Sequence, residues 1–597
     1  MLKLQPALKS VNICRLLQKH QNADSTSMKE DFYFSLQEGF FPQERKLNTV
    51  ECVITTKRMD VSQTAKRISV GQEPRQLRYH SIVHQHQHQP KWNETVHIDI
   101  ENDEYSKLYV QIDCIHWGNK DKTAPERKLV GYFYPTSLDD GSALADGSYD
   151  IPLYKVSRNL DPISCIKRQG KFTIIFVIHA IKGLFAAASE PIDRYKLVVG
   201  MVLRSHLISQ NPSVHALINW REKPDTLPDT LNKFSFVEMK DVLQCFIPIV
   251  QALLEVMEEQ TKMQMFAYNT LIFVFGLLVD DKTEQYAQWM DKLGDKMVLQ
   301  KETTVHSALV QSILYYLSKL DSTSHAKYIR GTIRSLPHLV TLLSYFYATV
   351  SEETKKQGVN DFMEELKKVF SCLNELLSLQ DPLKVALQSN CLQVLAEVIP
   401  KLEELYNPDQ LVDVVTELLI VIKNNPTLST QSMTVDKLLL VQSIANCKFY
   451  LDSDCSIFPD GLLDQIVQFL NFHLGGSRKE MIECSYCLSV LLDGIQRKGK
   501  RKEDAFELLI PLLSPLSSAC AGLNYDAHNQ LDLMTAFLSI LHGATETHFK
   551  TYFSGLPTSE RYSWLQTLCS TSWKILLSTY PSHWFTVYVV HFIIDSC

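Results

Sequence analysis

The sequence lacks the features of several large classes of protein. No stretch reaches the ~20 consecutive apolar residues that a membrane-spanning helix needs. The most apolar stretch, Phe172–Ala188, contains a histidine, a lysine and a glycine, and we predict a buried strand followed by a turn there. The first twenty residues have no uninterrupted apolar block, so we expect no signal peptide. The 14 cysteines show no spacing typical of a disulfide framework, which predicts a reduced, intracellular protein.

An excess of positive charge is also missing. The chain has 60 Lys and Arg against 67 Asp and Glu, a formal net charge of -7 at pH 7. Because a protein that binds nucleic acid through its overall charge is basic, nucleic acid is not an expected partner.

Signatures of catalysis are absent as well. The sequence has no P-loop, no set of kinase motifs, no G-x-S-x-G elbow and no H-E-x-x-H zinc motif. Over 597 residues, this absence predicts that the chain is not an enzyme. We therefore expect no cofactor, no catalytic residue and no bound metal.

The composition is that of an ordinary folded protein. Hydrophobic residues make up 45% and charged residues 21% of the chain, which excludes a mostly disordered protein, a collagen and a coiled-coil rod. At ~150 residues per domain, the length corresponds to about four domains. Residues 1–30 are polar, and we interpret them as a linker or a frayed helix.

Residues 31–210 have the pattern of short strands. Apolar residues alternate or are β-branched in stretches such as Val96–Ile100 and Leu108–Ile112, and clusters such as Asn119–Lys122 and Asp139–Ser142 favour turns between them. Many short strands at such spacing predict an antiparallel β-sandwich. A sandwich with loops gathered at one end suggests a C2-type membrane module.

From residue 211 to residue 597 the hydrophobic period changes to that of a helix. In Lys240–Glu259 the apolar residues form one helical stripe, and the pattern recurs in Phe362–Leu379 and Leu411–Ile422. Nearly 400 residues of helix cannot form a single bundle. We therefore predict an α-solenoid of armadillo or HEAT type, with ~40 residues per repeat, and we expect the array to be incomplete at its C-terminal end.

Two loops of the predicted sandwich are rich in bases. Calcium needs several carboxylate oxygens, whereas these loops would repel it and attract phosphate groups. The candidate lipid-binding residues are Lys120, Lys122, Arg127, Lys128, Arg45 and Lys46. Near an anionic bilayer each would contribute ~1 kcal/mol. The alternative is that they are ordinary solvated loop charges. Phe40 and Phe41 would either insert into the membrane interface or plug the end of the sandwich.

Two clusters of possible metal ligands or redox groups have simpler explanations. His84, His86 and His88 would share one face of a strand, but no cysteine or carboxylate follows at ligand spacing. We interpret them as a solvated strand end. Cys484 and Cys487 form a single CxxC within a helical pattern, where both sulfurs lie on one face, so we predict a buried apolar pair.

A third cluster superficially resembles a calcium site. Asp139, Asp140 and Asp146 lie next to glycines. They lack the spacing of an EF-hand loop, so we interpret them as turn residues.

Several stretches carry a resemblance to a known family. They are Tyr79–Val83, Gln89–Val96, Lys120–Lys122, Leu138–Gly147, Leu153–Lys155, Ser209–Asn211 before Leu217–Trp220, Lys240–Gln244 and Tyr580–Trp584. In this order they resemble the dedicator of cytokinesis (DOCK) family of Rho-GTPase exchange factors. The resemblance extends from about residue 31 to the end of the sequence.

The resemblance implies a function that composition could not. In the family, a C2-type region binds phosphatidylinositol trisphosphate through basic loops, and an armadillo-like region serves as a scaffold. A separate C-terminal region binds Rac or a related GTPase and drives the release of GDP and magnesium. The pattern looks closest to the Rac-directed branches, which use an ELMO-type adaptor through N-terminal segments.

The chain also departs from the family pattern. We expect it to lack the C-terminal exchange region and the N-terminal adaptor-binding segments, and residues 156–194 stand where the family has a long polar loop. The prediction is a cytoplasmic membrane-targeting scaffold of a guanine nucleotide exchange factor, recruited peripherally to the plasma membrane for Rac signalling to the actin cytoskeleton. The alternatives are part of a phosphoinositide 3-kinase, or a calcium-dependent C2 adaptor with a solenoid.

Overall fold

The structure is a computed structural model. It describes residues 30–42, 49–60, 67–71, 73–85, 87–100, 102–117, 126–156, 162, 165–166, 191–280, 288–297, 305–349, 352–428, 431–453, 455–457, 460–498, 501–521 and 527–564. The chain forms two compact units, Met1–Lys292 and Leu293–Cys597.

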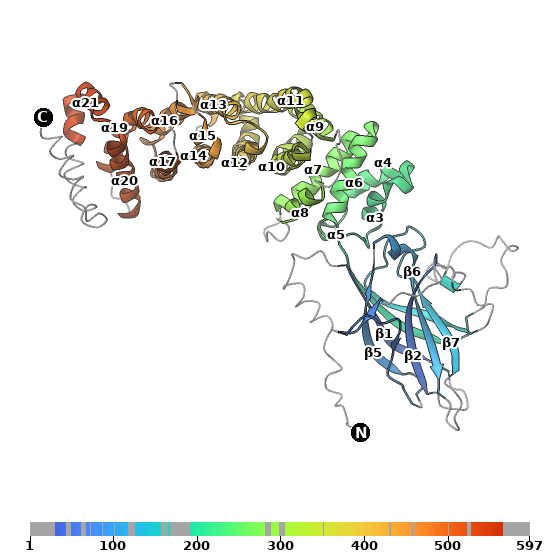
Figure 1. Ribbon diagram of the computed structural model, residues 1–597. Helices are drawn as coiled ribbons and strands as arrows, with labels where there is room; N and C mark the ends of the chain where they lie inside the picture. The colour runs from blue at the N-terminus through green and yellow to red at the C-terminus, as the bar shows by residue number, and fades with distance from the viewer. Residues whose placement is uncertain are drawn as a thin grey trace. The chain divides into compact units, whose positions relative to one another are not determined.

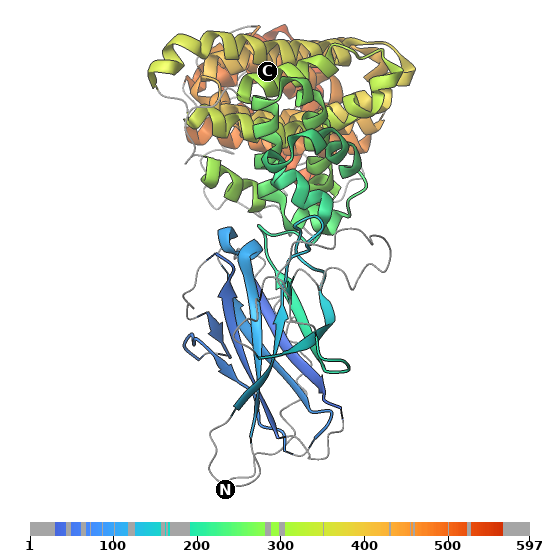
Figure 2. The same ribbon diagram turned by 90° about the vertical axis from the view of Figure 1, so that its right-hand side faces the viewer.

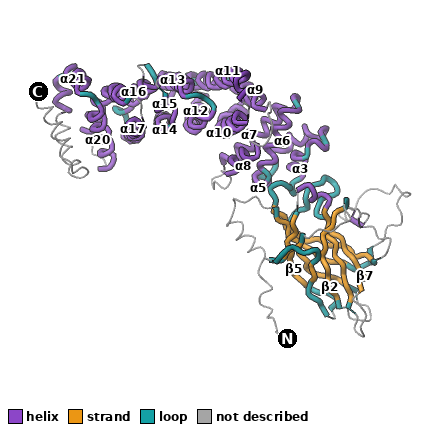
Figure 3. Tube along the Cα trace, viewed as in Figure 1, coloured by secondary structure: helices purple, strands orange, loops and turns teal. Residues whose placement is uncertain are grey.

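The first unit begins with an antiparallel sheet of nine strands among the described residues (Figures 1 and 3). The strands are β1 (Asp31–Phe40), β2 (Val50–Arg58), β3 (Ile68–Ser69), β4 (Tyr79–His80), β5 (Lys91–Asp99), β6 (Leu108–His116), β7 (Glu126–Phe133), β8 (Gly147–Lys155) and β9 (Lys196–Arg204). Their order is β3-β5-β1-β9-β8-β7-β6-β2-β4.

Strand β8 joins two layers of this sheet. Its first part, Gly147–Pro152, pairs with β9, whereas Leu153–Lys155 pairs with β7. The two layers enclose one apolar core. On β1 the side chains alternate, so that Phe32, Phe34 and Leu36 are fully buried in this core, as a half-buried strand requires. The predicted β-sandwich is confirmed.

Strand register defines the two ends of the sandwich. At one end, Val50 pairs with His116 and Phe40 pairs with Lys196. We call this the loop end, because the β1–β2 and β6–β7 connections leave from it. At the opposite end Asp31 pairs with Arg204, the last residue of β9. We call that the helix end, because the chain continues from it into the first helix. The strands run lengthwise between the two ends in Figure 2.

The helices of the first unit follow directly. They are α3 (Pro212–Ile218), α4 (Leu227–Phe234), α5 (Met239–Gln244), α6 (Phe246–Glu259), α7 (Gln264–Asp280) and α8 (Gln288–Met297), of which α8 continues past the division between the units. The first begins at Asn211, whose side chain accepts hydrogen bonds from the Ser213 and Val214 amides and so caps the helix.

Helix α7 belongs to a long apolar segment. Among the described residues, Thr261–Asp280 is one segment long and apolar enough to cross a bilayer. In the structure α7 packs against α4, α5 and α6, and residues such as Tyr268, Leu271 and Phe275 are fully buried. One face of α7 is therefore packed against these three helices.

Hydrogen bonds fix the helix end of the sandwich to α5. The Gln244 side-chain amide donates to the Ser205 carbonyl at 2.7 Å, and the Asn211 side-chain amide donates to the Asp241 carboxylate at 2.8 Å. The His206 Nδ1 lies 3.0 Å from the Gln244 carbonyl oxygen. The last strand therefore leads into the helices through a hydrogen-bonded joint.

The second unit is helical throughout its described part. Its helices are α9 (Val305–Leu317), α10 (Ala326–Thr349), α11 (Glu352–Ser378), α12 (Val385–Lys401), α13 (Pro408–Asn424), α14 (Gln431–Asn446), α15 (Lys448–Asp452), α16 (Leu462–His473), α17 (Arg478–Lys498), α18 (Lys502–Leu509), α19 (Leu513–Ala521), α20 (Ala527–Gly543) and α21 (Glu546–Gly555).

These helices stack in two rows (Figure 1). One row is α10-α12-α14-α17-α20 and the other is α9-α11-α13-α16-α18, and each helix contacts its neighbours in its row. This is the arrangement of an α-solenoid, and it confirms the predicted fold class. Helices α12, α14, α17 and α20 begin roughly 47 residues apart, nearer to HEAT and armadillo repeats than to 34-residue units.

Two buried amides close the C-terminal end of α11. The Asn425 side chain donates to the Leu377 and Leu379 carbonyls at 2.6 and 3.0 Å. The Gln388 side chain donates to the Leu376 and Leu379 carbonyls at 3.0 and 2.7 Å. The last carbonyls of a helix have no partner within it, so these amides from the next two helical segments link successive repeats.

We predict that Asn425→Ala lowers the free energy of unfolding of the helical part by about 2 kcal/mol, because buried carbonyls then lose their donors. Chemical denaturation followed by circular dichroism measures the change. The neighbouring Asn424 is exposed, so Asn424→Ala is the matched control and should change stability little. Equal effects of both substitutions would contradict this role for Asn425.

Candidate functional site

The predicted lipid-binding residues fall largely on parts of the chain that are not described. The backbone of Arg127 and Lys128 belongs to β7, but their side chains lie outside the described residues. The others that lie outside are Lys120, Lys122, Arg45 and Lys46. Most of the insert 156–194, including Phe172–Ala188, and residues 1–29 and 565–597 also lie outside. The predictions for these segments remain predictions.

The described strands nevertheless place one end of each base-rich connection side by side. The first one ends at Thr49 and the second one begins at Trp117, and the Trp117 amide donates to the Thr49 carbonyl at 3.0 Å. On the next residue pair, Val50 lies opposite His116. Segments more than sixty residues apart in the sequence therefore leave from neighbouring strands at the loop end.

The two aromatic residues at the C-terminal end of β1, Phe40 and Phe41, have different roles. Phe41 is buried, and its ring lies 6.2 Å from that of Tyr195, edge to face. Phe41 therefore plugs the end of the sandwich. Of the two alternatives, this role and insertion into the membrane interface, the structure favours the first. Phe40 is partly exposed and lies under the Lys196 ammonium, 4.8 Å from the ring centre.

A buried carboxylate organises the outer surface of the loop end. Glu51 on β2 is only 7% exposed. One of its oxygens lies 2.7 Å from the His80 Nδ1, and the other accepts a hydrogen bond from the Trp117 indole at 2.9 Å. Sequence reasoning did not find this cluster, because Glu51 lies on β2, His80 on β4 and Trp117 directly after β6, and no local motif links them.

The histidine stripe does not assemble into a metal site in the described chain. His84 packs its ring against Trp92 at 5.4 Å, and its backbone pairs with Val50. The His88 carbonyl accepts from the Phe41 amide at 2.9 Å, whereas His86 lies outside the described residues. Over the described part of the chain, no group of three or more His, Cys, Asp or Glu side chains could hold a metal ion.

The aspartates of the turn between β7 and β8 lie toward the helix end. Asp140 accepts from the Ser142 amide at 3.0 Å and from the Ser142 hydroxyl at 2.7 Å. Burial raises the pKa of this carboxyl, but the hydrogen bonds from Ser142 outweigh it and the pKa is lowered. This is a turn stabilised by its own side chain.

The Asp146 carboxylate also accepts hydrogen bonds from other residues of the chain. It accepts from the Leu203 backbone amide at 2.9 Å, the Gln210 side-chain amide at 2.8 Å and the Arg204 guanidinium at 2.7 Å. These bonds tie the start of β8 to the end of β9. Asp140 and Asp146 therefore have structural partners at the end of the sandwich opposite the base-rich loops.

The single CxxC is an apolar pair in the solenoid, as predicted. Cys484 and Cys487 on α17 are both buried, and the Cys487 thiol donates to the Leu438 carbonyl at 3.1 Å. Burial raises the pKa of Cys487 to about 12. A thiol with such a high pKa is a poor nucleophile and a poor redox group.

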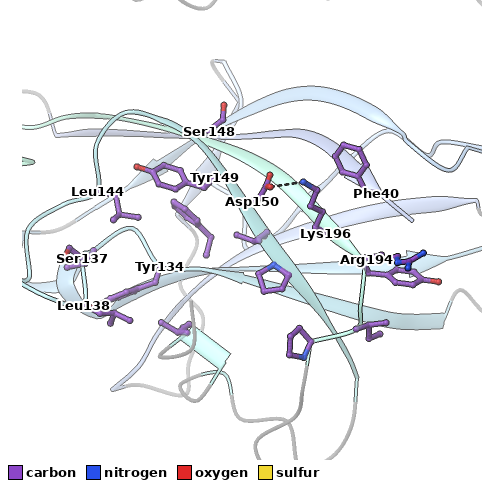
Figure 4. Close-up of a pocket in the computed structure, with 18 of the residues that line it drawn as sticks. Phe40, Tyr134, Ser137, Leu138, Leu144, Ser148, Tyr149, Asp150, Arg194 and Lys196 are labelled. Atoms are coloured by element: carbon purple, nitrogen blue, oxygen red, sulfur yellow. Dashed lines mark hydrogen bonds and ion pairs between the residues drawn. The ribbon is translucent and has the colours of Figure 1, made fainter. Parts of the chain in front are cut away.

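A cavity of about 1050 Å³ lies along the side of the sandwich, where β7 and β8 diverge (Figure 4). Its walls are apolar and aromatic, including Phe133, Leu144 and Tyr149. The cations among its described lining residues are both paired, Lys196 with Asp150 at 2.7 Å and Arg194 with Asp193 at 3.4 Å. The cavity thus offers an anionic headgroup little uncompensated charge.

Comparisons with protein families match both parts of the chain. Residues 25–169 match the family described as the C2 domain in Dock180 and Zizimin proteins. Residues 223–594 match the family described as the dedicator of cytokinesis (DOCK) TPR region.

Individual relatives cover nearly the whole chain. Mouse dedicator of cytokinesis protein 3 is 22% identical over 596 residues, covering 93% of this chain and 28% of that protein. Human dedicator of cytokinesis protein 4 is 21% identical over 589 residues, covering 93% of this chain and 29% of that protein. The chain therefore spans less than a third of the length of these relatives.

Solved structures similar to part of the chain include a C2 domain. A C2 domain of plant extended synaptotagmin 1 is 10% identical with a TM-score of 0.17, covering 30% of this chain and 95% of that domain. This value is too low to bear on the arrangement of the strands.

Proposed function

Because this chain belongs to the dedicator of cytokinesis (DOCK) family, we propose that it is the membrane-targeting and scaffold portion of a guanine nucleotide exchange factor for Rac-type GTPases. The protein would be cytoplasmic and would be recruited peripherally to the plasma membrane by phosphatidylinositol trisphosphate, in signalling to the actin cytoskeleton. An ELMO-type adaptor and the GTPase would bind other parts of the longer protein.

One observation carries the lipid part of this proposal. The two base-rich connections leave from neighbouring strands, at the backbone bond between Trp117 and Thr49. Arg45, Lys46, Lys120 and Lys122 come from these two connections. Several cations that converge on one polyphosphate headgroup bind it more strongly than single charges do. The solenoid supports the scaffold part, since stacked repeats present a long surface.

The proposal is tested by flotation of the full chain with phosphatidylcholine vesicles that carry or lack phosphatidylinositol trisphosphate. We expect the chain to float only with vesicles that carry this lipid. Equal flotation with both kinds of vesicle, or flotation with neither, would contradict the proposal.

We also predict that binding does not require calcium. The carboxylates Asp140 and Asp146 already accept hydrogen bonds from protein donors, and both precede β8 toward the helix end. The flotation assay should therefore give the same bound fraction with calcium and with a chelator. A bound fraction that falls severalfold in the chelator would favour the alternative, a calcium-dependent C2 adaptor.

By itself, this chain is not expected to exchange the nucleotide of a GTPase. In the family that the chain resembles, a separate region binds the GTPase and displaces magnesium, which anchors the nucleotide phosphates. We therefore predict that the 597-residue chain leaves the rate of fluorescent GDP release from Rac unchanged. A rate that rises with the concentration of the chain would show that the scaffold itself carries exchange activity.

A further inference from the structure

We propose that an apolar rim at the loop end, formed by Ile82, Val83 and Trp117, inserts into the interfacial layer of an anionic bilayer. This inference rests on the proposed lipid binding and adds a second, non-electrostatic contact to it. The three side chains are 46%, 38% and 41% exposed. Large apolar side chains gathered at one end of a domain are a feature of interaction surfaces.

The backbone beneath this rim holds the side chains in place on both sides of β2. On one side, Val50 and His84 exchange backbone hydrogen bonds at 2.9 and 3.0 Å, and the Ser81 amide donates to the Cys52 carbonyl at 2.9 Å. On the other side, the Trp117 amide donates to the Thr49 carbonyl. The rim therefore spans the start of β2, at the level of the two base-rich connections.

The segment that carries Ile82 is also fixed from inside the sandwich. The indole of the buried Trp92 donates to the Ile82 carbonyl at 2.9 Å, and the Ile82 amide donates to the Glu94 carboxylate at 3.2 Å. Both backbone polar groups of this residue are satisfied, and its apolar side chain is left exposed. Because the backbone is already ordered, binding through this side chain costs little conformational entropy.

Trp117 has the character of an interfacial anchor. Its indole N–H is already bonded to the Glu51 carboxylate, so inserting the ring leaves no polar group without a partner. Tryptophan is enriched at the boundary between lipid and water because one part of the ring is apolar and the other polar.

The charges that flank the rim in the sequence favour a bilayer over other apolar partners. In the sequence Trp117 is followed by Lys120 and Lys122, and Arg45 and Lys46 precede Thr49. Apolar side chains flanked by lysine and arginine are the pattern of segments that lie in the interface of anionic membranes. A basic border of this kind would bring the rim to the headgroups.

The test uses the full chain and vesicles of phosphatidylcholine with phosphatidylinositol trisphosphate. The double substitution Ile82→Ala and Val83→Ala leaves every backbone hydrogen bond of the segment in place. We expect it to weaken vesicle binding about tenfold, because two partly buried side chains are lost from the interface. Leu138 is 44% exposed in the connection after β7, toward the helix end, so Leu138→Ala is the matched control and should bind like the wild type.

Insertion is measured directly by quenching of tryptophan fluorescence with brominated lipids. The chain contains seven tryptophans, and we expect most of the quenching to disappear in Trp117→Phe, whose ring keeps the apolar contact. We also expect part of the wild-type binding to resist about 0.5 M salt, which screens charge contacts but not apolar ones. That resistant part should be lost in the double alanine variant.

The outcomes separate this inference from the proposed function. Wild-type binding that depends on phosphatidylinositol trisphosphate, with no quenching and an unaffected double variant, would overturn the rim and leave the lipid binding intact. Absence of binding to any vesicle would overturn both. If the double variant binds vesicles normally but abolishes self-association seen by light scattering, the rim is a contact between copies of the chain, and the bilayer assignment is wrong.

Discussion

Reversing the charge of Lys120, Lys122 and Lys128 to glutamate should lower the affinity for vesicles with phosphatidylinositol trisphosphate by roughly a hundredfold or more. Each lysine near an anionic surface contributes about 1 kcal/mol, so removing three costs about 3 kcal/mol before the added repulsion is counted. Flotation or vesicle titration of the variant chain measures the change.

A charge-matched control is available in the helical part of the first unit. Lys223, Lys240 and Lys262 are exposed there, and their reversal changes the net charge of the chain by the same amount. We expect this control to keep most of the affinity, because its charges come from helical segments and not from the base-rich connections. Equal losses in both triple variants would show that only overall charge matters.

The second large effect concerns stability. Replacing Lys437 by methionine should raise the free energy of unfolding of the helical part by about 3 kcal/mol at pH 7. Lys437 is 4% exposed within α14, and burial lowers its pKa to about 8 from the ordinary value of 10.5. Burial is the whole cause of this lowered pKa, and no ion pair of Lys437 is found among the described residues.

The effect of this substitution should depend on pH. Between pH 8 and pH 10.5 the unfolded chain holds a proton on Lys437 that the folded chain has lost, so the wild type gains stability as the pH rises. The advantage of the methionine variant should therefore shrink over this range and vanish near pH 10.5. Thermal unfolding in the presence of a reductant, at a series of pH values, follows the change.

The control for this prediction is Lys479→Met on α17. Lys479 is exposed, so its substitution should alter stability little at any of these pH values. A Lys437→Met variant that is less stable than the wild type at pH 7 would contradict the prediction. It would indicate that the ammonium has a stabilising partner.

Hydrophobic periodicity was sufficient to predict the two kinds of fold. Residues such as Phe32 and Phe34 alternate because one face of β1 is buried. The stripe predicted in Lys240–Glu259 is buried as expected, but the structure divides it at Cys245 between α5 and α6. These are local patterns, set by the geometry of a strand or a helix. The stacking of helices in two rows follows from the same stripes, since each unit buries its apolar face on its neighbours.

The chemistry of the loop end was only partly predictable. The base-rich connections can be seen in the sequence, but the contact of Glu51 with His80 and Trp117 joins residues from different strands. Only the strand register brings these residues together, and periodicity does not specify register between distant strands. The division of roles between Phe40 and Phe41 was open for the same reason.

Sequence patterns could not predict the buried polar groups of the solenoid either. A lysine such as Lys437, or an amide such as Asn425, is normally assigned to the surface. Both are buried here, because α14 has neighbours on both sides in its row and Asn425 closes the end of a neighbouring helix. Such positions depend on how repeats stack, which is a long-range property.

The most direct test of the central claim, that the loop end of the sandwich faces the membrane, is hydrogen exchange of the full chain with and without vesicles carrying phosphatidylinositol trisphosphate. We predict slower exchange in peptides that cover residues 41–50, 80–85 and 116–126, and unchanged exchange in residues 136–147 toward the helix end. Protection of residues 136–147 with none at the loop end would contradict the account.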